Sequence, residues 1–373
     1  MRITGAVLEE SGRPRPYARS RPITVGELEL GDPGPTEVLV AIEAAGVCHS
    51  DLSVVDGNRP RPLPMLLGHE AAGRVLARGD RVADLEVGQR VVMSFLPRCE
   101  SCAACARDGL LPCTNGSRAN AAGELLGHPG RLSRAGAQVR HHLGVSAFAT
   151  HAVVDRASVV PVGADVPPEV AALLGCAVLT GGGAVLNVAR PEPDDTVMVI
   201  GLGGVGMAAL LVAKALGVRR IMAVDRLPDK LAAARALGAA ETCTPTEVVE
   251  RGLRARFAIE CAGHPAALET AYAATEAGGV TITVGLPAPT STVTLPALSI
   301  TAEARTVVGS YLGSAVPARD IPRYERMWRE GLLPVERLIS SRIGLADINT
   351  AMDLLADGAA VRQVVMFDHQ PPE

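Results

Sequence analysis

The sequence predicts an α/β protein in which a doubly wound parallel sheet is inserted between two parts of a β-rich domain. Three observations support this prediction. Residues 1 to about 175 contain short apolar runs that Gly and Pro interrupt, as short strands do. From Thr196 onward, apolar strands alternate with helices, a pattern typical of a parallel sheet that helices cover on both faces. After about Leu312 this alternation stops, and the chain closes on another strand-like run.

The composition indicates a globular protein with a core of its own. The chain has 373 residues, of which 48% are hydrophobic and 20% charged, and its formal net charge is -4. This balance gives no electrostatic reason to expect a nucleic acid or an anionic membrane as partner. Nearly all basic residues are arginine, because lysine occurs only at Lys214 and Lys230. The opening residues lack the charged and apolar regions of a signal peptide, so we expect a cytoplasmic protein.

The elements of the first part are expected in the following order. One strand opens the chain, and two longer strands cover residues 37–47 and 70–77. The polar, glycine-rich text of residues 107–142 indicates a long surface excursion. A helix is expected over residues 166–189, where two prolines precede a run of small apolar residues.

The second part repeats strand and helix units. Strands are expected over residues 196–203, 219–225, 256–263 and 280–285, and helices over residues 205–217, 228–239 and 264–279. The longest apolar stretch, residues 197–218, contains five glycines and Lys214. It therefore predicts a strand, a turn and a buried helix better than a membrane span. The last strand is expected over residues 361–367.

A glycine motif joins the first of these strands to its helix. Gly201, Gly203 and Gly206 have the G-x-G-x-x-G spacing, with Leu202, Gly204 and Val205 between them. The first glycine permits a tight turn, the second lets a pyrophosphate approach the backbone, and the third lets helix and strand pack closely. The alternative is a glycine-rich turn without a ligand.

An acidic residue favours the dinucleotide interpretation of this motif. Asp225 ends the next strand, where a carboxylate takes both hydroxyls of an adenosine ribose. A carboxylate there repels a 2′-phosphate, so the sequence predicts NAD rather than NADP. Arg226 follows directly and would partly accommodate that phosphate.

Four of the eight cysteines lie within fifteen residues. Cys99, Cys102, Cys105 and Cys113 offer four thiolates from one loop, and clustered thiols in a chain without an export signal indicate a metal site. Four protein ligands leave no open position, so we expect a structural zinc site. The alternatives are a pair of disulfides or an iron–sulfur cluster.

A second set of candidate residues is spread over three strings. GVCHSDL contains Cys48, Ser50 and Asp51, LLGHEAAG contains His69 and Glu70, and GCAVLTGGG contains Cys176. Two thiolates and one imidazole would bind zinc and leave a fourth position open for a substrate oxygen. Taken singly, each residue is also compatible with a buried free thiol or a loop histidine, and spacing alone does not join them.

Together these strings resemble the zinc-dependent medium-chain alcohol dehydrogenases over nearly the whole chain. The resemblance includes GHE, the four-cysteine loop, GLGGVG, VDRLPDK and the closing VRQVV. It implies a GroES-like catalytic domain over residues 1–177, with the structural-zinc loop at 99–113, and a Rossmann domain over residues 178–312. Residues 313–373 would complete the catalytic domain. The long excursion after Cys113 is similar to the dimeric branch of the family, which implies a homodimer.

The resemblance also assigns roles to individual residues. Cys48, His69 and Cys176 would bind the catalytic zinc, Asp51 would orient His69, and Glu70 would lie close behind the metal. Ser50 would take the proton of the alcohol. In many relatives a histidine ends the relay that carries this proton to solvent. This chain has Ser53 at that position, and a serine hydroxyl has no pKa near neutrality. The cofactor contacts would come from His49 and Arg362 at the pyrophosphate, Asp225 and Lys230 at the adenosine ribose, and Thr180 and Val284 at the nicotinamide.

The implied activity is NAD-dependent interconversion of an alcohol with an aldehyde or ketone. The substrate pocket would be lined by Arg59, Phe95, His142 and Leu143; Phe95 suits an apolar chain, and Arg59 and His142 would suit a polar or anionic group. Arg59 and His142 would equally suit a solvated rim. Three alternatives stay open: a thiol-linked formaldehyde dehydrogenase, a relative with a tightly bound nicotinamide cofactor, and a catalytically silent protein that binds zinc and NAD.

Overall fold

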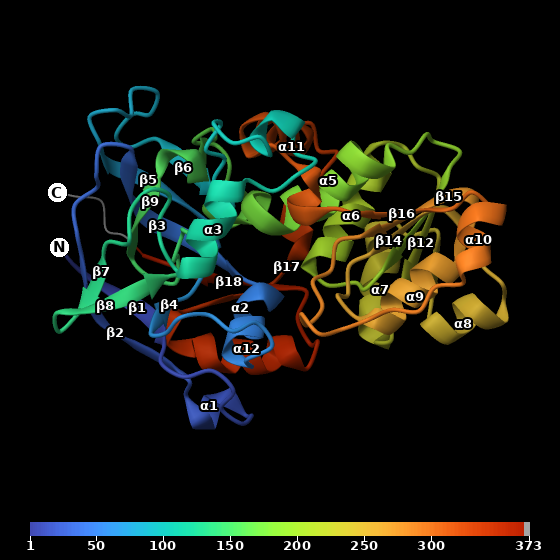
Figure 1. Cartoon of the computed structure of the whole chain (residues 1–373), viewed down its shortest axis with the longest axis horizontal. Helices are drawn as coiled ribbons and strands as arrows, with labels where there is room; N and C mark the ends of the chain where they lie inside the picture. The colour runs from blue at the N-terminus through green and yellow to red at the C-terminus, as the bar shows by residue number, and fades with distance from the viewer. Residues whose placement is uncertain (369–373) are drawn as a thin grey trace. The chain divides into compact units, whose positions relative to one another are not determined.

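The computed structural model describes residues 1–368, which form two compact units (Figure 1). Unit 1 contains Met1–Cys176, Val316–Glu325 and the chain from Ile339 onward, and unit 2 contains Ala177–Ala315 and Arg326–Leu338. Residues 326–338 were expected in the catalytic domain. They pack in unit 2 instead, because Val335 and Leu338 are buried there and Arg337 donates to the Ala236 carbonyl at 2.8 Å. Residues 369–373 of the expected last segment lie outside the described residues.

Unit 1 is built from a closed barrel and a seven-stranded sheet. The barrel has the strand order β1-β2-β7-β8-β4, and the sheet has the order β10-β6-β5-β3-β18-β17 with β9 paired to β3. The strands are β1 (Arg2–Leu8), β2 (Ile23–Leu30), β3 (Glu37–Val47), β4 (Met65–Leu66), β5 (Glu70–Arg78), β6 (Arg90–Met93), β7 (Leu132–Arg134), β8 (Ala137–His141), β9 (His151–Asp155), β10 (Val159–Pro161), β17 (Ile339–Ile343) and β18 (Arg362–Met366). The three strands predicted from the first part of the sequence are confirmed as β1, β3 and β5, and the last predicted strand as β18.

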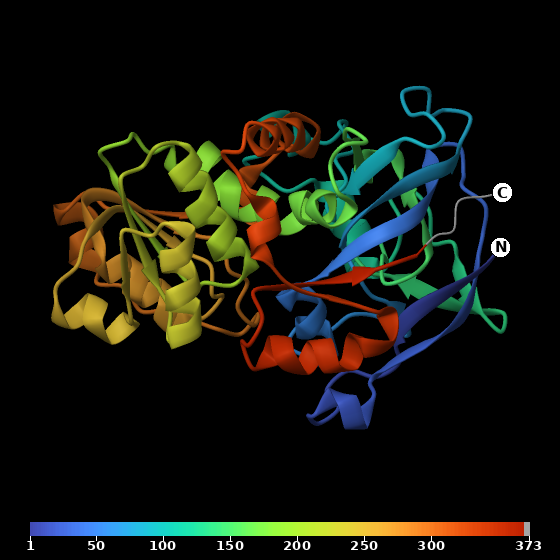
Figure 2. The same ribbon diagram turned by 180° about the vertical axis from the view of Figure 1, so that it is seen from behind.

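Short helices connect these strands and lie beside them. In Figure 2, β18 and the helix before it, α12, are seen from behind. The helical elements are α1 (Tyr17–Ser20), α2 (His49–Val55), η1 (Cys105–Arg107), α3 (Thr114–Ala122), η2 (Arg156–Ser158), α4 (Pro168–Leu173), α11 (Pro317–Arg329), η7 (Leu345–Asp347) and α12 (Ile348–Ala356). The last turn of α11, from Arg326, belongs to unit 2. Branched aliphatic side chains fill the core between sheet, barrel and helices, among them Val40, Ile42, Val91 and Ile348.

The expectation of a long surface excursion over residues 107–142 is wrong. This segment contains α3 and the barrel strands β7 and β8. Its few apolar residues are spaced so that Leu125, Leu132 and Val139 enter the barrel core. The polar Asn120 is also buried, where its amide donates to the Phe95 carbonyl at 2.7 Å. The polar composition of the segment therefore led to a wrong prediction for a folded part of unit 1.

The predicted helix over residues 166–189 is confirmed, with two wider π-helical turns within it. It consists of α4, η3 (Leu174–Val178), α5 (Leu179–Gly183) and η4 (Ala184–Ala189), of which η3 and η4 are π-helical. Pro168–Ala189 is long and apolar enough to cross a membrane, but 89% of its most apolar window is buried within the protein. Such burial is typical of a core helix.

Unit 2 contains a parallel sheet with the strand order β13-β12-β11-β14-β15-β16, the doubly wound order of dinucleotide-binding domains. Figures 1 and 2 show helices on both faces of this sheet. The strands are β11 (Thr196–Ile200), β12 (Arg220–Val224), β13 (Glu241–Cys243), β14 (Ala255–Glu260), β15 (Thr275–Thr283) and β16 (Thr306–Gly309). The helical elements are α6 (Gly204–Ala215), α7 (Pro228–Leu237), α8 (Pro245–Glu250), α9 (Pro265–Ala273), α10 (Ala297–Ala302), η5 (Tyr311–Ser314) and η6 (Val335–Leu338).

All seven strands and helices predicted for unit 2 are confirmed, but several boundaries are displaced. The strands expected to end at residues 203 and 263 end at Ile200 and Glu260. The helix expected over residues 264–279 ends at Ala273, and β15 begins at Thr275. Thr275 is fully buried and its hydroxyl bonds to that of Thr281 at 2.7 Å, so this part of the chain joins the sheet. Lys214 in α6 donates to the Leu237 carbonyl at 3.1 Å.

Candidate active site

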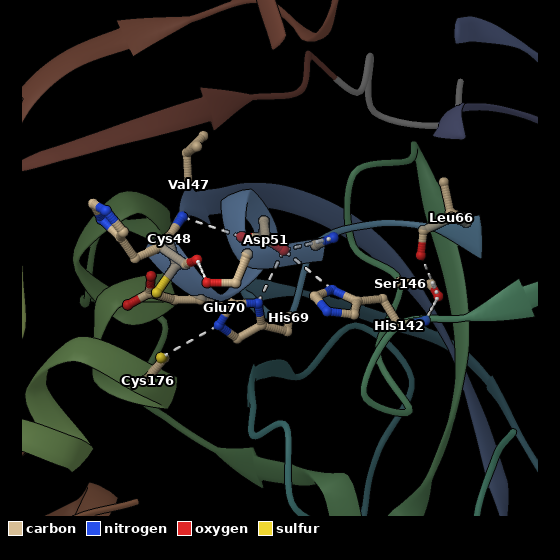
Figure 3. A network of polar contacts seen from close by, with 12 residues as sticks. Val47, Cys48, Asp51, Leu66, His69, Glu70, His142, Ser146 and Cys176 are labelled. Carbon is tan, nitrogen blue, oxygen red and sulfur yellow. Dashed lines mark hydrogen bonds and ion pairs between the residues drawn. The ribbon is translucent and has the colours of Figure 1, made fainter. Parts of the chain in front are cut away.

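Two cysteines and a histidine from separate elements of unit 1 come together in its interior. The ligand atoms of Cys48, His69 and Cys176 all lie within 4.8 Å of one another, and all three residues are buried. His69 Nε2 lies 3.5 Å from Cys176 Sγ (Figure 3). Cys48 precedes α2, His69 precedes β5, and Cys176 lies in the π-helical turn η3. The fold thus joins three residues that spacing in the sequence could not join.

Local backbone features place these three side chains. Cys48 is the N-cap of α2: its thiol receives the backbone N–H of Asp51, and Asp51 Oδ2 accepts the Cys48 N–H at 3.1 Å. Gly68, just before His69, has φ +92, and a Cβ there would lie 2.5 Å from the Phe148 nitrogen. Only glycine meets both conditions, so Gly68 determines how the chain presents His69.

Asp51 is the centre of the polar network around this cluster (Figure 3). Its Oδ1 lies 3.0 Å from His69 Nδ1 and 3.1 Å from His142 Nδ1, and the side chain is fully buried. Burial raises the pKa of Asp51, but the interactions with His69 and His142 outweigh it and lower this pKa to about 2. The ionised carboxylate accepts from His69 Nδ1, which leaves Nε2 free to bind a metal.

A buried ion pair lies on the other side of the cluster. Arg362 Nη1 is 3.1 Å from Glu70 Oε2 and donates to the Val47 carbonyl at 3.0 Å. Burial lowers the pKa of Arg362, but Glu70 and the thiols of Cys48 and Cys176 outweigh it and raise this pKa. Arg362 was expected at a pyrophosphate; the structure places it beside Glu70, and its cofactor role stays a prediction.

The same surroundings favour an ionised thiol. The pKa of Cys48 lies well below its ordinary value, because Cys176 hydrogen-bonds to it and Arg362 attracts its negative charge. Cys48 also caps a helix, whose N-terminus stabilises a thiolate. Metal binding requires such a thiolate.

The donor set and its spacing fit a tetrahedral zinc ion. Zinc–sulfur bonds of about 2.3 Å and zinc–nitrogen bonds of about 2.0 Å place sulfur about 3.5 Å from nitrogen at tetrahedral angles. The 3.5 Å between Cys176 Sγ and His69 Nε2 agrees with this separation. Three protein donors leave a fourth position for a substrate or water.

The four clustered cysteines form a second candidate metal site. The sulfur atoms of Cys99, Cys102, Cys105 and Cys113 lie within 4.8 Å of one another, and Cys102 Sγ is 4.0 Å from Cys113 Sγ. Two sulfurs bound to one zinc are about 3.8 Å apart. All four are free thiols, so the pair of disulfides considered from the sequence is not formed.

Hydrogen bonds from the loop prepare these thiols for a metal. Backbone N–H groups of Cys105 and Thr114 lower the pKa of Cys102 to about 5. Gly116 donates to Cys113 Sγ at 3.3 Å, and the Asn115 amide donates to Cys99 Sγ at 3.3 Å. The four sulfurs leave no open position, which suits a structural ion.

Unit 2 contains the glycine motif in the conformation that the sequence predicts. Gly201 has φ +89, and a Cβ on Gly206 would lie 2.0 Å from the Gly201 carbonyl oxygen. Asp225 follows β12, where Oδ2 accepts the Leu202 N–H at 2.7 Å and Oδ1 accepts the Leu227 N–H at 3.0 Å. Asp225 therefore also fixes the glycine loop. Burial lowers the pKa of Lys230, and the charge of Asp225 opposes that shift.

Thr180 and Val284, the predicted nicotinamide contacts, are both buried in unit 2. The Val284 N–H donates to the Glu260 carbonyl at 2.9 Å. The side chain of Glu260 accepts from the Gly263 N–H at 2.6 Å and from the Thr283 hydroxyl at 3.1 Å. Glu260, which the sequence analysis missed, thus joins the ends of β14 and β15.

The remaining predicted residues lie in unit 1 around α2 and His69. Phe95 and His142 flank the His69 ring at centroid distances of 5.5 and 5.4 Å, both edge to face. Leu143 is buried next to His142. Arg59 follows α2 and donates its N–H to the Ser53 carbonyl, and no described contact brings it to His69.

The predicted relay residues are all in α2. His49 is exposed, and Ser50 and Ser53 are half-buried. The Ser53 hydroxyl donates to the His49 carbonyl at 2.8 Å.

Arg226 is exposed in unit 2. The Ser146 hydroxyl accepts the His142 N–H at 2.9 Å. Like Glu260, Ser146 was not predicted from the sequence, because no motif surrounds it.

Comparisons with known proteins agree with this arrangement. Residues 34–164 match the family described as Alcohol dehydrogenase GroES-like domain, and residues 204–330 match that described as Zinc-binding dehydrogenase. An alcohol dehydrogenase zinc-binding domain protein from Burkholderia ambifaria and the benzyl alcohol dehydrogenase from Acinetobacter calcoaceticus are each 30% identical, with TM-scores of 0.91 and 0.90. Both matches cover 99% of this chain and 100% of the other. An acetophenone reductase from Geotrichum candidum, solved in complex with NAD, shares the fold at 23% identity, with a TM-score of 0.78 over 98% of this chain and 97% of the other.

Proposed function

Because the chain belongs to the zinc-dependent medium-chain alcohol dehydrogenase family, we propose that it interconverts an alcohol and an aldehyde or ketone by hydride transfer to or from NAD. The observation that carries this proposal is the buried convergence of Cys48, His69 and Cys176. Zinc held by these three residues would polarise the substrate oxygen and lower the pKa of an alcohol.

The protein residues around this cluster hold charges and protons in place. Asp51 keeps the His69 proton on Nδ1, so that Nε2 faces Cys176. Arg362 balances the negative charge of Glu70 and of the thiolates. Ser50 would accept the proton that the alcohol loses.

The cofactor half of the proposal rests on unit 2. The N-terminus of α6 behind Gly201, Gly203 and Gly206 would hold the pyrophosphate. Asp225 would accept from the adenosine ribose hydroxyls, and its charge would disfavour a 2′-phosphate. Because Arg226 is exposed and next to it, the choice of NAD over NADP must be measured directly.

Aromatic primary alcohols are the first substrates to test. One relative with 30% identity is a benzyl alcohol dehydrogenase. Phe95, which lies against the His69 ring and is 8% exposed, would give an aromatic substrate an apolar contact.

The experiment follows NADH formation with a panel of primary, aromatic and acidic alcohols, with and without low-molecular-weight thiols. We expect turnover that Ser50→Ala abolishes almost completely and that Ser53→Ala, the matched control in the same helix, leaves nearly intact. Turnover that requires the thiol would favour a thiol-linked formaldehyde dehydrogenase, and cofactor absorbance after desalting would favour a tightly bound nicotinamide. Zinc and NAD binding without turnover of any alcohol would contradict the proposal.

We also propose that the chain forms a homodimer through unit 2. Strand β16 is at the edge of the six-stranded sheet and pairs only with β15 among the described residues. Exposed apolar side chains gather in and near it, with Leu298 80% exposed and Val307 39% exposed. An edge strand of this kind can pair with its own copy across a two-fold axis. Sedimentation of the wild type at twice the chain mass, and of Val307→Glu at the chain mass, is the expected result.

A further inference from the structure

We infer that His142 is a positioning residue that holds Asp51 against the metal ligand His69, rather than a residue that contacts the substrate. The inference rests on the proposed zinc site of Cys48, His69 and Cys176. It assigns His142 to the support of that site and predicts that the zinc ion is retained less firmly without it.

The contacts of Asp51 carry the first step of the argument. Its Oδ1 lies near His69 Nδ1 at 3.0 Å, His142 Nδ1 at 3.1 Å and the Gly68 N–H at 3.2 Å, and its Oδ2 accepts the Cys48 N–H at 3.1 Å. Each carboxylate oxygen has about two acceptor positions, so three contacts crowd around Oδ1, whereas Oδ2 receives one. The carboxylate is fully buried, and a buried charge is stable only when it is surrounded by donors. His142 is therefore one of two imidazoles on which the orientation of Asp51 depends.

The loop that carries His142 is attached to the segment that carries His69. The His142 N–H donates to the Ser146 hydroxyl at 2.9 Å, and that hydroxyl donates to the Leu66 carbonyl at 2.9 Å (Figure 3). Leu143 and Ser146 have φ 52 and φ 56, in the left-handed region that non-glycine residues seldom adopt. Such a backbone persists only where its surroundings hold it, so the position of His142 is enforced.

The ring of His142 also packs against the ligand itself. Its centroid is 5.4 Å from that of His69, with an angle of 89° between the rings, and Phe95 occupies a similar edge position at 5.5 Å. His142 is 1% exposed. A side chain so enclosed, with Nδ1 directed at Asp51, is better placed to support the metal ligand than to meet a substrate.

The consequence for the metal follows from the role of Asp51. When the carboxylate is held firmly, the His69 proton stays on Nδ1 and the ring keeps Nε2 toward Cys176. Loss of His142 would remove the polar contact of its Nδ1 with Asp51 Oδ1 at 3.1 Å and leave the His69 ring without one of its two edge contacts. Changes in residues that orient metal ligands lower metal affinity by about 10-fold to 100-fold.

The test compares His142→Phe, which keeps a ring but removes the nitrogen, with His142→Asn, whose amide keeps a donor near the position of Nδ1. The matched control is His141→Phe, because His141 is equally buried in the adjacent position but accepts from the Arg131 N–H instead of facing Asp51. The zinc-loaded full-length proteins are mixed with a chromophoric chelator, and the release of each zinc ion is timed. Far-UV circular dichroism and thermal unfolding establish that each variant is folded.

We expect the wild type to release one zinc ion faster than the other. His142→Phe should release the faster one about 10-fold to 100-fold sooner, His142→Asn should fall between His142→Phe and the wild type, and His141→Phe should match the wild type. Equal release from His142→Phe and the wild type, with a changed KM for the alcohol, would overturn the inference and return His142 to the substrate pocket. If His142→Phe does not fold, Ser146→Ala, which only loosens the loop, must accelerate release, or the inference fails. A zinc content that Cys176→Ala leaves unchanged would instead contradict the proposed function.

Discussion

The substitution Gly46→Ala tests whether the Glu70 side chain can keep its position only because Gly46, its partner in the sheet, has no side chain. Gly46 in β3 is paired with Glu70 in β5, and a Cβ on Gly46 would lie 2.4 Å from Glu70 Oε2 and 2.8 Å from its Cδ. Ordinary van der Waals contact begins at 3.4 Å, so the acid would have to move by about 1 Å, the difference of 3.4 and 2.4. Glu70 is fully buried, and its carboxylate is paired with Arg362 at 3.1 Å.

The expected cost has two parts. Overpacking a core by one methyl group costs about 1–3 kcal/mol. Complete disruption of a buried ion pair costs about 3–5 kcal/mol, and a displacement of about 1 Å would lose only a fraction of that. We therefore expect the free energy of unfolding to fall by about 2–4 kcal/mol, which corresponds to a decrease of about 3–5 °C in Tm for a chain of 373 residues.

The assay is thermal unfolding of the zinc-loaded protein, and Gly26→Ala in β2 is the control because no atom lies within 4 Å of its added Cβ. Glu70→Asp shortens the acid by one methylene group and removes the collision. Gly46→Ala should thus cost less than half as much in the Glu70→Asp background as in the wild type. Equal effects of Gly46→Ala and Gly26→Ala, or equal penalties in the two backgrounds, would refute the reasoning.

Three further predictions concern the cofactor, the metals and acid stability. Asp225→Asn removes the charge but keeps an acceptor for the Leu202 N–H. The ratio of kcat/KM for NAD to that for NADP should therefore fall about tenfold or more. An unchanged ratio would show that Asp225 does not select the cofactor. Metal analysis should find about two zinc ions per chain and about one in both Cys105→Ala and Cys176→Ala; only Cys105→Ala should lower Tm strongly, whereas Cys176→Ala should stay folded without turnover. Burial lowers the pKa of His141 from 6.5 to about 3, so the folded state binds fewer protons than the unfolded state and stability is lost as the pH falls from 6.5 toward 3. His141→Phe should flatten this loss by up to about 1.4 kcal/mol per pH unit, and parallel stability curves would contradict it.

Sequence patterns were most informative where function depends on neighbouring residues. The turn that needs Gly201 and Gly206 is encoded in six consecutive residues, and Asp225 follows at the end of the next strand. The four clustered cysteines likewise lie in one loop, so their spacing alone indicates a metal site. The parallel sheet of unit 2, though not its two edge strands β13 and β16, follows from the alternation of strands with helices.

The rest depends on contacts between distant residues. His142 meets Asp51 only because the left-handed backbone at Leu143 and Ser146 returns the chain toward Leu66, and no periodic pattern signals such a loop. The barrel strands β7 and β8 were missed because they are three and five residues long within polar text. Their few apolar residues are recognisable as core residues only in the closed barrel, where Leu132 and Val139 pack in its interior.

The scarcity of lysine gives the protein a simple amine chemistry. Besides the N-terminus, whose nitrogen donates to the Leu30 carbonyl, Lys214 and Lys230 carry the only primary amines of the chain. Lys214 is engaged with the Leu237 carbonyl, whereas burial lowers the pKa of Lys230 and so raises the share of its neutral, nucleophilic form. An acylating reagent would therefore leave at most three adducts, which intact-mass spectrometry can count. Because Lys230 lies beside Asp225, its acylation would show whether a bound cofactor covers the predicted ribose site in unit 2.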